Sequence, residues 1–144
     1  MRRLALLLIG LCLALPVLAA DTARAARKEV FGDITVHYGA FTSSMLTPQV
    51  AAATGLVRSR HQGVLSLTVL RDGKPITAVV SGAVKDLTGR KQPLAFKQVT
   101  DHGTASYVAQ FTIEQPETVV FELGVQAGGV SHSFSFNQDV FPGE

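Results

Sequence analysis

Hydrophobic and polar residues alternate with a period of two along most of this chain, which is the pattern of half-buried β-strands. Seven such rows occur from residue 34 onwards, over residues 34–38, 65–69, 76–84, 94–96, 107–113, 119–125 and 134–136. Turn sequences separate several rows, among them Asp72-Gly73 and Gly128-Gly129, and these residue types tolerate the positive φ of tight hairpins. The pattern therefore predicts an antiparallel all-β domain of about seven strands.

One segment between the first two rows departs from this alternation. Thr47 is a candidate N-cap, Pro48 stands at the first helical position, alanines follow, and Gly55 provides an exit. These are the ordinary start and stop signals of an α-helix. We therefore expect one short helix over residues 47–55, bridging the first and second strands.

An immunoglobulin-like β-sandwich is the architecture that best fits these elements. The Cys-Trp-Cys core of antibody domains is absent, so this likeness concerns architecture alone. A small outer-membrane barrel is the alternative for alternating strands, but such barrels carry aromatic girdles. This chain has no Trp and only two Tyr, so the sandwich is favoured.

The first twenty residues have a different character, which predicts export. Arg2 and Arg3 precede an apolar run over residues 4–15, and Pro16 and small residues follow, as in a cleaved signal peptide. The run is shorter than the roughly 20 residues that a membrane-spanning helix needs. We expect a signal peptide over 1–20, a flexible polar lead-in over 21–28 and a single sandwich domain over 29–144. The mature protein is then periplasmic and does not span the membrane.

Removing the signal peptide changes the composition. The only cysteine, Cys12, leaves with it, which excludes disulfides, thiol chemistry and thiolate metal sites from the mature chain. Arg2 and Arg3 are two of 13 Lys and Arg residues, and without them 11 basic residues face 11 acidic ones. A neutral balance predicts no binding to nucleic acid or to an anionic membrane surface.

The sequence carries no catalytic motif, so we predict no catalytic residues and a protein that is not an enzyme. It has no Gly-x-Ser-x-Gly and no distinctive carboxylate pair. Four histidines fall in different strands or turns, namely His37, His61, His102 and His132. Met45 is the only methionine after the signal peptide. We therefore assign no metal ligand and no cofactor. A periplasmic copper-type metal-handling protein is the second hypothesis, should the fold bring histidines together, and a small hydrolase is the third.

Two segments are candidates for binding a partner. Arg58, Arg60 and His61 form the densest basic cluster, and in a strand the two arginines would point the same way and could grip a carboxylate or phosphate. Phe134 and Phe136, with Phe141, make the C-terminal strand aromatic; core packing explains them, and an exposed aromatic edge could also add a partner's strand. Our first hypothesis is a non-catalytic module that binds a periplasmic or envelope protein through one of these segments.

Several short motifs in order along the chain carry a resemblance to a known family. They are Phe31-Gly32-Asp33-Ile34-Thr35-Val36-His37-Tyr38, Leu46-Thr47-Pro48, Gly55-Leu56-Val57-Arg58-Ser59, Asp86-Leu87-Thr88-Gly89 and Glu117-Thr118. With them the chain resembles the bacterial domain-of-unknown-function family 4426 over nearly all of its mature length. It departs at Gly39 and Asp86, where Asn is frequent in that family. The resemblance implies an exported Gram-negative protein and transfers no catalytic or binding residues.

Overall fold

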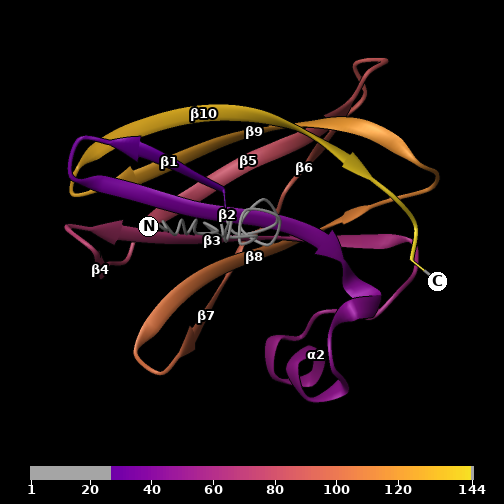
Figure 1. Cartoon of the computed structure of the whole chain (residues 1–144), viewed down its shortest axis with the longest axis horizontal. Helices are drawn as coiled ribbons and strands as arrows, with labels where there is room; N and C mark the ends of the chain where they lie inside the picture. Colours follow the sequence, from indigo (N-terminus) through magenta and orange to yellow (C-terminus); the bar gives the residue numbers. More distant parts are fainter. Residues whose placement is uncertain (1–26, 144) are drawn as a thin grey trace, which may run out of the picture.

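A computed structural model describes residues 27–143, and their strands form two antiparallel sheets packed face to face (Figure 1). The predicted all-β sandwich is confirmed. The predicted signal peptide and residues 21–26 lie outside the described residues. Within the described range, no helix has the length and apolar character that a membrane crossing requires.

The first sheet has the strand order β1-β2-β3-β8-β7, with the short β4 paired to the end of β3. Its strands are β1 (Arg27–Phe31), β2 (Ile34–Thr42), β3 (Gln62–Arg71), β4 (Lys74–Pro75), β7 (Lys97–Asp101) and β8 (Thr104–Thr112). The second sheet has the order β10-β9-β5-β6. Its strands are β5 (Val79–Asp86), β6 (Lys91–Pro93), β9 (Glu117–Ala127) and β10 (Val130–Val140).

The described residues form ten strands, whereas the alternation predicted about seven. Four of the observed strands were not predicted: β4 and β6 are only two and three residues long, β1 has the sequence Arg-Lys-Glu-Val-Phe, which does not alternate, and β7 begins just after the row expected at 94–96. β1 begins at Arg27, so the last two residues assigned to the flexible lead-in belong to a sheet. The row expected at 94–96 is not a strand: it connects β6 to β7, and Leu94 N donates to Gly82 O at 2.9 Å.

The short helix between the first two long strands is confirmed as α2 (Pro48–Thr54). The Thr47 side chain accepts a hydrogen bond from Val50 N, and Gly55 ends the helix at φ 71°, a conformation that glycine adopts at little cost. A 3₁₀ turn, η1 (Ser43–Met45), precedes it. Leu46 and Leu56, on either side of α2, pack with Val64 and Val108 of the first sheet, so this excursion covers part of the sheet's outer face.

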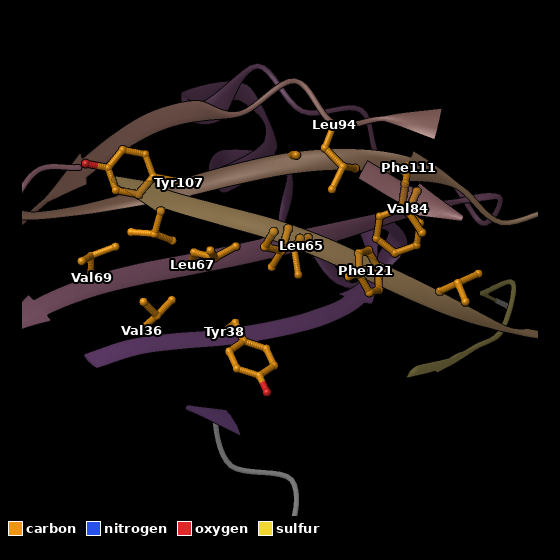
Figure 2. Packing of buried hydrophobic residues seen from close by; sticks show 14 of the residues in the cluster. Val36, Tyr38, Leu65, Leu67, Val69, Val84, Leu94, Tyr107, Phe111 and Phe121 are labelled. Carbon is orange, nitrogen blue, oxygen red and sulfur yellow. The ribbon is translucent and has the colours of Figure 1, made fainter. Parts of the chain in front are cut away.

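The main core lies between the sheets and consists of every second residue of the long strands (Figure 2). Leu65, Leu67 and Val69 of β3 have no exposed surface, and Phe121 of β9 faces them from the other sheet. Because consecutive strand residues point to opposite faces, one register fixes the whole set. The alternation read from the sequence therefore identified these core positions correctly.

Candidate functional site

The basic segment Arg58-Ser59-Arg60-His61 lies in the loop between α2 and β3 rather than in a strand, and we call it the arginine loop. The two arginines therefore do not share a strand face. Arg58, Arg60 and His61 are all exposed. Among residues 27–143, none of these three side chains has an ion-pair or hydrogen-bond partner, so both guanidinium groups are available to an external carboxylate or phosphate.

The backbone of this loop is nevertheless held in place. Ser43 of η1 is fully buried, and its Oγ accepts a hydrogen bond from Ser59 N at 2.9 Å and donates one to Ser59 O at 3.0 Å. The Ser59 hydroxyl in turn accepts from His61 N at 3.1 Å. The arginine side chains thus extend into solvent from a fixed backbone, which lowers the entropic cost of binding through them.

The C-terminal segment after β10 reaches the same loop. Gly143 N donates to Arg60 O at 2.8 Å, and Thr42 Oγ1 donates to Phe141 O at 3.1 Å. Figure 1 shows this segment descending from β10 toward the 3₁₀ turn beside α2. The structure therefore joins the arginine loop to the end of the last strand, two regions that the sequence offered as separate candidates.

Three large apolar side chains near this junction are exposed. Met45 is 74% exposed, Phe141 59% and Phe41 36%. Together with the two arginines they form what we call the C-terminal end surface, defined by Phe41, Met45, Arg58, Arg60 and Phe141. The sequence analysis had noted Phe141 in the aromatic C-terminal strand, but it missed Phe41 and Met45 as binding residues because a Phe or Met in a strand-rich chain is ordinarily assigned to the core.

Phe134 and Phe136 lie on the inner face of β10 and are half-buried. The ring of Tyr38 lies 5.2 Å from that of Phe134 and 4.4 Å from that of Phe136, and Phe121 stacks on Phe136 at 4.9 Å. These contacts connect the two sheets. They account for both rings by core packing, as the first interpretation of these residues held.

Within the described part of the chain, one side of the β10 backbone has no strand partner, because β10 is an edge of its sheet and pairs with β9 alone. Arg27 Nη1 donates to Asn137 O at 3.2 Å from β1, so this carbonyl faces away from β9. Because the direction alternates along an antiparallel strand, Ser131, Ser133 and Ser135 direct their backbone groups to the same open side.

The structure does not gather the histidines. His37 lies on β2, His61 in the arginine loop and His102 in the β7–β8 turn, while His132 stacks on Phe31 at 4.6 Å. No group of three or more His, Cys, Asp or Glu side chains that could hold a metal ion occurs in the described part of the chain. The geometry therefore offers no support for the metal-handling hypothesis.

Two hollows could in principle hold a small molecule. One, of about 560 Å³, lies on the outer face of β5, β9 and β10, and the other, of about 300 Å³, lies between β6 and the ends of β8 and β9. Neither is lined by a histidine, so neither presents a serine beside a histidine base.

Two carboxylates of these hollows, Glu122 and Asp86, are also poorly suited to proton transfer near neutral pH. Hydrogen bonds from Lys85, at 2.9 Å, and from Lys91 hold the pKa of Glu122 below its usual range. In the second hollow, hydrogen bonds led by that of the Thr88 hydroxyl lower the pKa of Asp86 to about 2. Both groups stay ionised at pH 7, and the hydrolase hypothesis gains no acid or base from them.

Comparison with solved structures identifies a similar fold in bacterial proteins. A crystal structure of a DUF4426 family protein (PA0388) from Pseudomonas aeruginosa PAO1 has 48% sequence identity and a TM-score of 0.78, covering 83% of this chain and 97% of the other. FetP from uropathogenic Escherichia coli strain F11, expressed in the periplasm of E. coli, has 12% identity and a TM-score of 0.61, covering 82% of this chain and 95% of FetP. A copper-bound FetP variant is similar at a TM-score of 0.62 and 12% identity, over 82% of this chain and 96% of the variant.

At 12% identity, the likeness to FetP concerns the fold alone. A search of curated proteins found no match. The family model described as "Domain of unknown function (DUF4426)" matches residues 28–143, which span the whole sandwich. The expected resemblance is thereby confirmed, and the chain belongs to the DUF4426 family.

Proposed function

We propose that this protein is a non-catalytic binding module of the bacterial periplasm, and that it binds a protein of the cell envelope through the C-terminal end surface. The observation that carries the proposal is the hydrogen bond from Gly143 N to Arg60 O. This bond brings the segment that follows Phe141 to the loop of Arg58 and Arg60, and the hydrogen bond from Thr42 Oγ1 to Phe141 O brings it beside η1, which carries Met45; both support a shared binding surface.

The composition of this surface supports a protein partner. Phe, Met and Arg are enriched at the centre of protein interfaces, where Lys and Glu are depleted. An exposed Phe or Met gains by transfer from water to an apolar pocket, and an arginine can bind a carboxylate through two parallel hydrogen bonds. The partner that fits combines an apolar side chain with acidic groups beside it.

The periplasmic location rests on the sequence of residues 1–20, which has the charge, apolar run and small residues of a cleaved signal peptide. FetP, similar in fold, was expressed in the periplasm. We expect fractionation of a Gram-negative host to recover a mature chain beginning at Ala20 or Asp21. A full-length chain in the cytoplasm would contradict this location.

Site-specific photo-crosslinking in cells tests the binding surface. A photoreactive phenylalanine analogue at Met45 or Phe141 should give one adduct of constant mass. The same analogue at Val79, which is 66% exposed on the outer face of β5, should not give it. The double substitution Arg58→Glu, Arg60→Glu should remove the adduct from Met45 while leaving the thermal melting of the protein unchanged. Equal adducts at Val79 and Met45, or adducts indifferent to the arginine substitutions, would overturn the proposal.

A further inference from the structure

We propose that two copies of this chain pair through the open edge of β10, with the two strands antiparallel and the two-fold axis at Ser133. The second sheet of one copy then continues into that of the other. This inference concerns a surface different from the C-terminal end surface and does not depend on it.

The composition of the four sheet edges is the first argument. Natural edge strands are protected from pairing by charge, by proline or by shortness. β1 carries Arg27, Lys28 and Glu29, β7 begins at Lys97, and β6 is three residues long with a lysine and a proline. β10 is eleven residues long, and its residues 130–137, Val-Ser-His-Ser-Phe-Ser-Phe-Asn, include no charged residue and no proline. Among the sheet edges formed by residues 27–143, only this one lacks the usual protection.

The contacts of the neighbouring strands show which part of the edge is open. Arg27 occupies the carbonyl of Asn137 on the open side, whereas β1 and β2 contact the N-terminal half of β10 through inward-facing rings, with Phe31 stacked on His132 at 4.6 Å and Tyr38 5.2 Å from Phe134. Among the described residues, none donates or accepts a hydrogen bond at the open-side backbone groups of Ser131, Ser133 and Ser135. Three exposed serines stand there, each with its N–H and C=O on the open side.

A second copy fits this segment because the segment is complementary to itself under a two-fold axis, which an isologous interface requires. With the axis at Ser133, this residue lies opposite its own copy and Ser131 lies opposite Ser135. On the inner face His132 lies opposite Phe134, a cross-strand aromatic pair made twice. No like charges meet, and the exposed parts of the half-buried rings lose contact with water.

The absence of cysteine from residues 13–144 gives a sharp test, because an engineered cysteine can then pair only with a second copy. The mature chain carrying Ser133→Cys should form a covalent dimer under mild oxidation, since opposed residues of an antiparallel pair bring their Cα atoms within disulfide range. Ser81→Cys is a matched control. Ser81 and Ser133 are the two register partners of Gly124 and are both exposed, but Ser81 lies on the interior strand β5.

Sedimentation equilibrium supplies the second readout. The unmodified mature chain should dimerise reversibly, and Ser133→Lys should weaken the dimer about tenfold or more, because it sets two ammonium groups opposite each other and restores the usual edge protection. Ser81→Lys should leave the dimer unchanged. A monomeric native chain at millimolar concentration, or oxidation of Ser81→Cys as fast as that of Ser133→Cys, would overturn the proposal. So would a β10 edge that crosslinks in cells to a different protein alone, which would assign the edge to a foreign strand.

Discussion

The ring of Phe111 on β8 lies directly against the backbone of Gly63, its cross-strand partner on β3. A Cβ added at Gly63 would overlap Cζ of that ring. Phe111 is 2% exposed and meets the ring of Phe121 edge to face at 5.1 Å between centroids. Gly63 is therefore part of the core packing, and its missing side chain makes room for an aromatic ring.

The substitution Gly63→Ala should destabilise the protein by about 1–3 kcal/mol, the usual cost of adding a methyl group to a packed core. Phe111 cannot move aside, because Phe121 and the opposite sheet enclose it. Gly39→Ala on β2 is the matched control, since its Cβ would meet nothing within 4 Å. Urea denaturation of both variants tests this prediction. Equal changes in the free energy of unfolding would show that the Phe111 ring is free to shift.

A second prediction concerns the chain segment that crosses from the first sheet to the second between β4 and β5. The hydroxyl of Tyr107 accepts a hydrogen bond from Ala78 N at 2.8 Å in this segment, at one end of the core cluster in Figure 2. Tyr107→Phe leaves that amide without its acceptor and should cost about 1–2 kcal/mol. Tyr38→Phe is the control, because the Tyr38 hydroxyl has no hydrogen-bond partner among residues 27–143. Thermal unfolding should give Tyr107→Phe a clearly lower melting temperature than Tyr38→Phe. The reverse order would contradict the role of this hydrogen bond.

A third prediction connects a buried serine to the binding surface. Ser43→Ala removes both hydrogen bonds to Ser59 and should cost about 1–3 kcal/mol, because polar backbone groups are left partly buried without partners. Loss of this tie should also speed amide exchange at Ser59 and His61. Ser44→Ala, one residue along, serves as the control. If amide exchange in the arginine loop is unchanged in Ser43→Ala, Ser43 does not hold the backbone of this loop in place.

The fourth prediction concerns pH and the turn between β5 and β6. Asp86 Oδ1 accepts from Thr88 N at 2.9 Å and from Arg90 N at 3.0 Å, and Arg90 Nε donates to Oδ2 at 3.1 Å. The pKa of Asp86 is lowered from 3.8 to about 2, so the folded state favours the ionised form. The resulting stabilisation is fully present above pH 3.8 and is lost as the pH falls from there through about 2.

Asp86→Asn should therefore lower the melting temperature at pH 5–7 and converge with the native chain near pH 2. Asparagine keeps an Oδ1 acceptor but not the charge. Asp72→Asn in the β3–β4 turn controls for the loss of a surface carboxylate, since asparagine also tolerates its φ of 51°. A difference between Asp86→Asn and the native chain that does not change with pH would exclude the proposed cause.

The sequence by itself determined those features that depend on neighbouring residues. Alternation assigned the inner and outer faces of the long strands, because side chains along a strand point to opposite sides whatever the partner is. Thr47, Pro48 and Gly55 identified the helix α2 because caps act within one turn. Asp72-Gly73 and Gly128-Gly129 occupy the positive-φ turns that their residue types predict. The short β4 and β6 escaped detection because two or three residues define no period.

Only the tertiary structure determined which residues distant in the sequence lie next to each other. Arg60 and Gly143 are far apart in the sequence, and only the packing of β10 over β2 brings them to one hydrogen bond. Exposure of Met45 and Phe141, and the burial of Phe134 and Phe136 against Tyr38, likewise follow from the pairing of two sheets. The same holds for the open edge of β10, because a strand is an edge only with respect to the order of all strands in its sheet. Local chemistry sets a residue's conformation, whereas a binding surface is a long-range property of the fold.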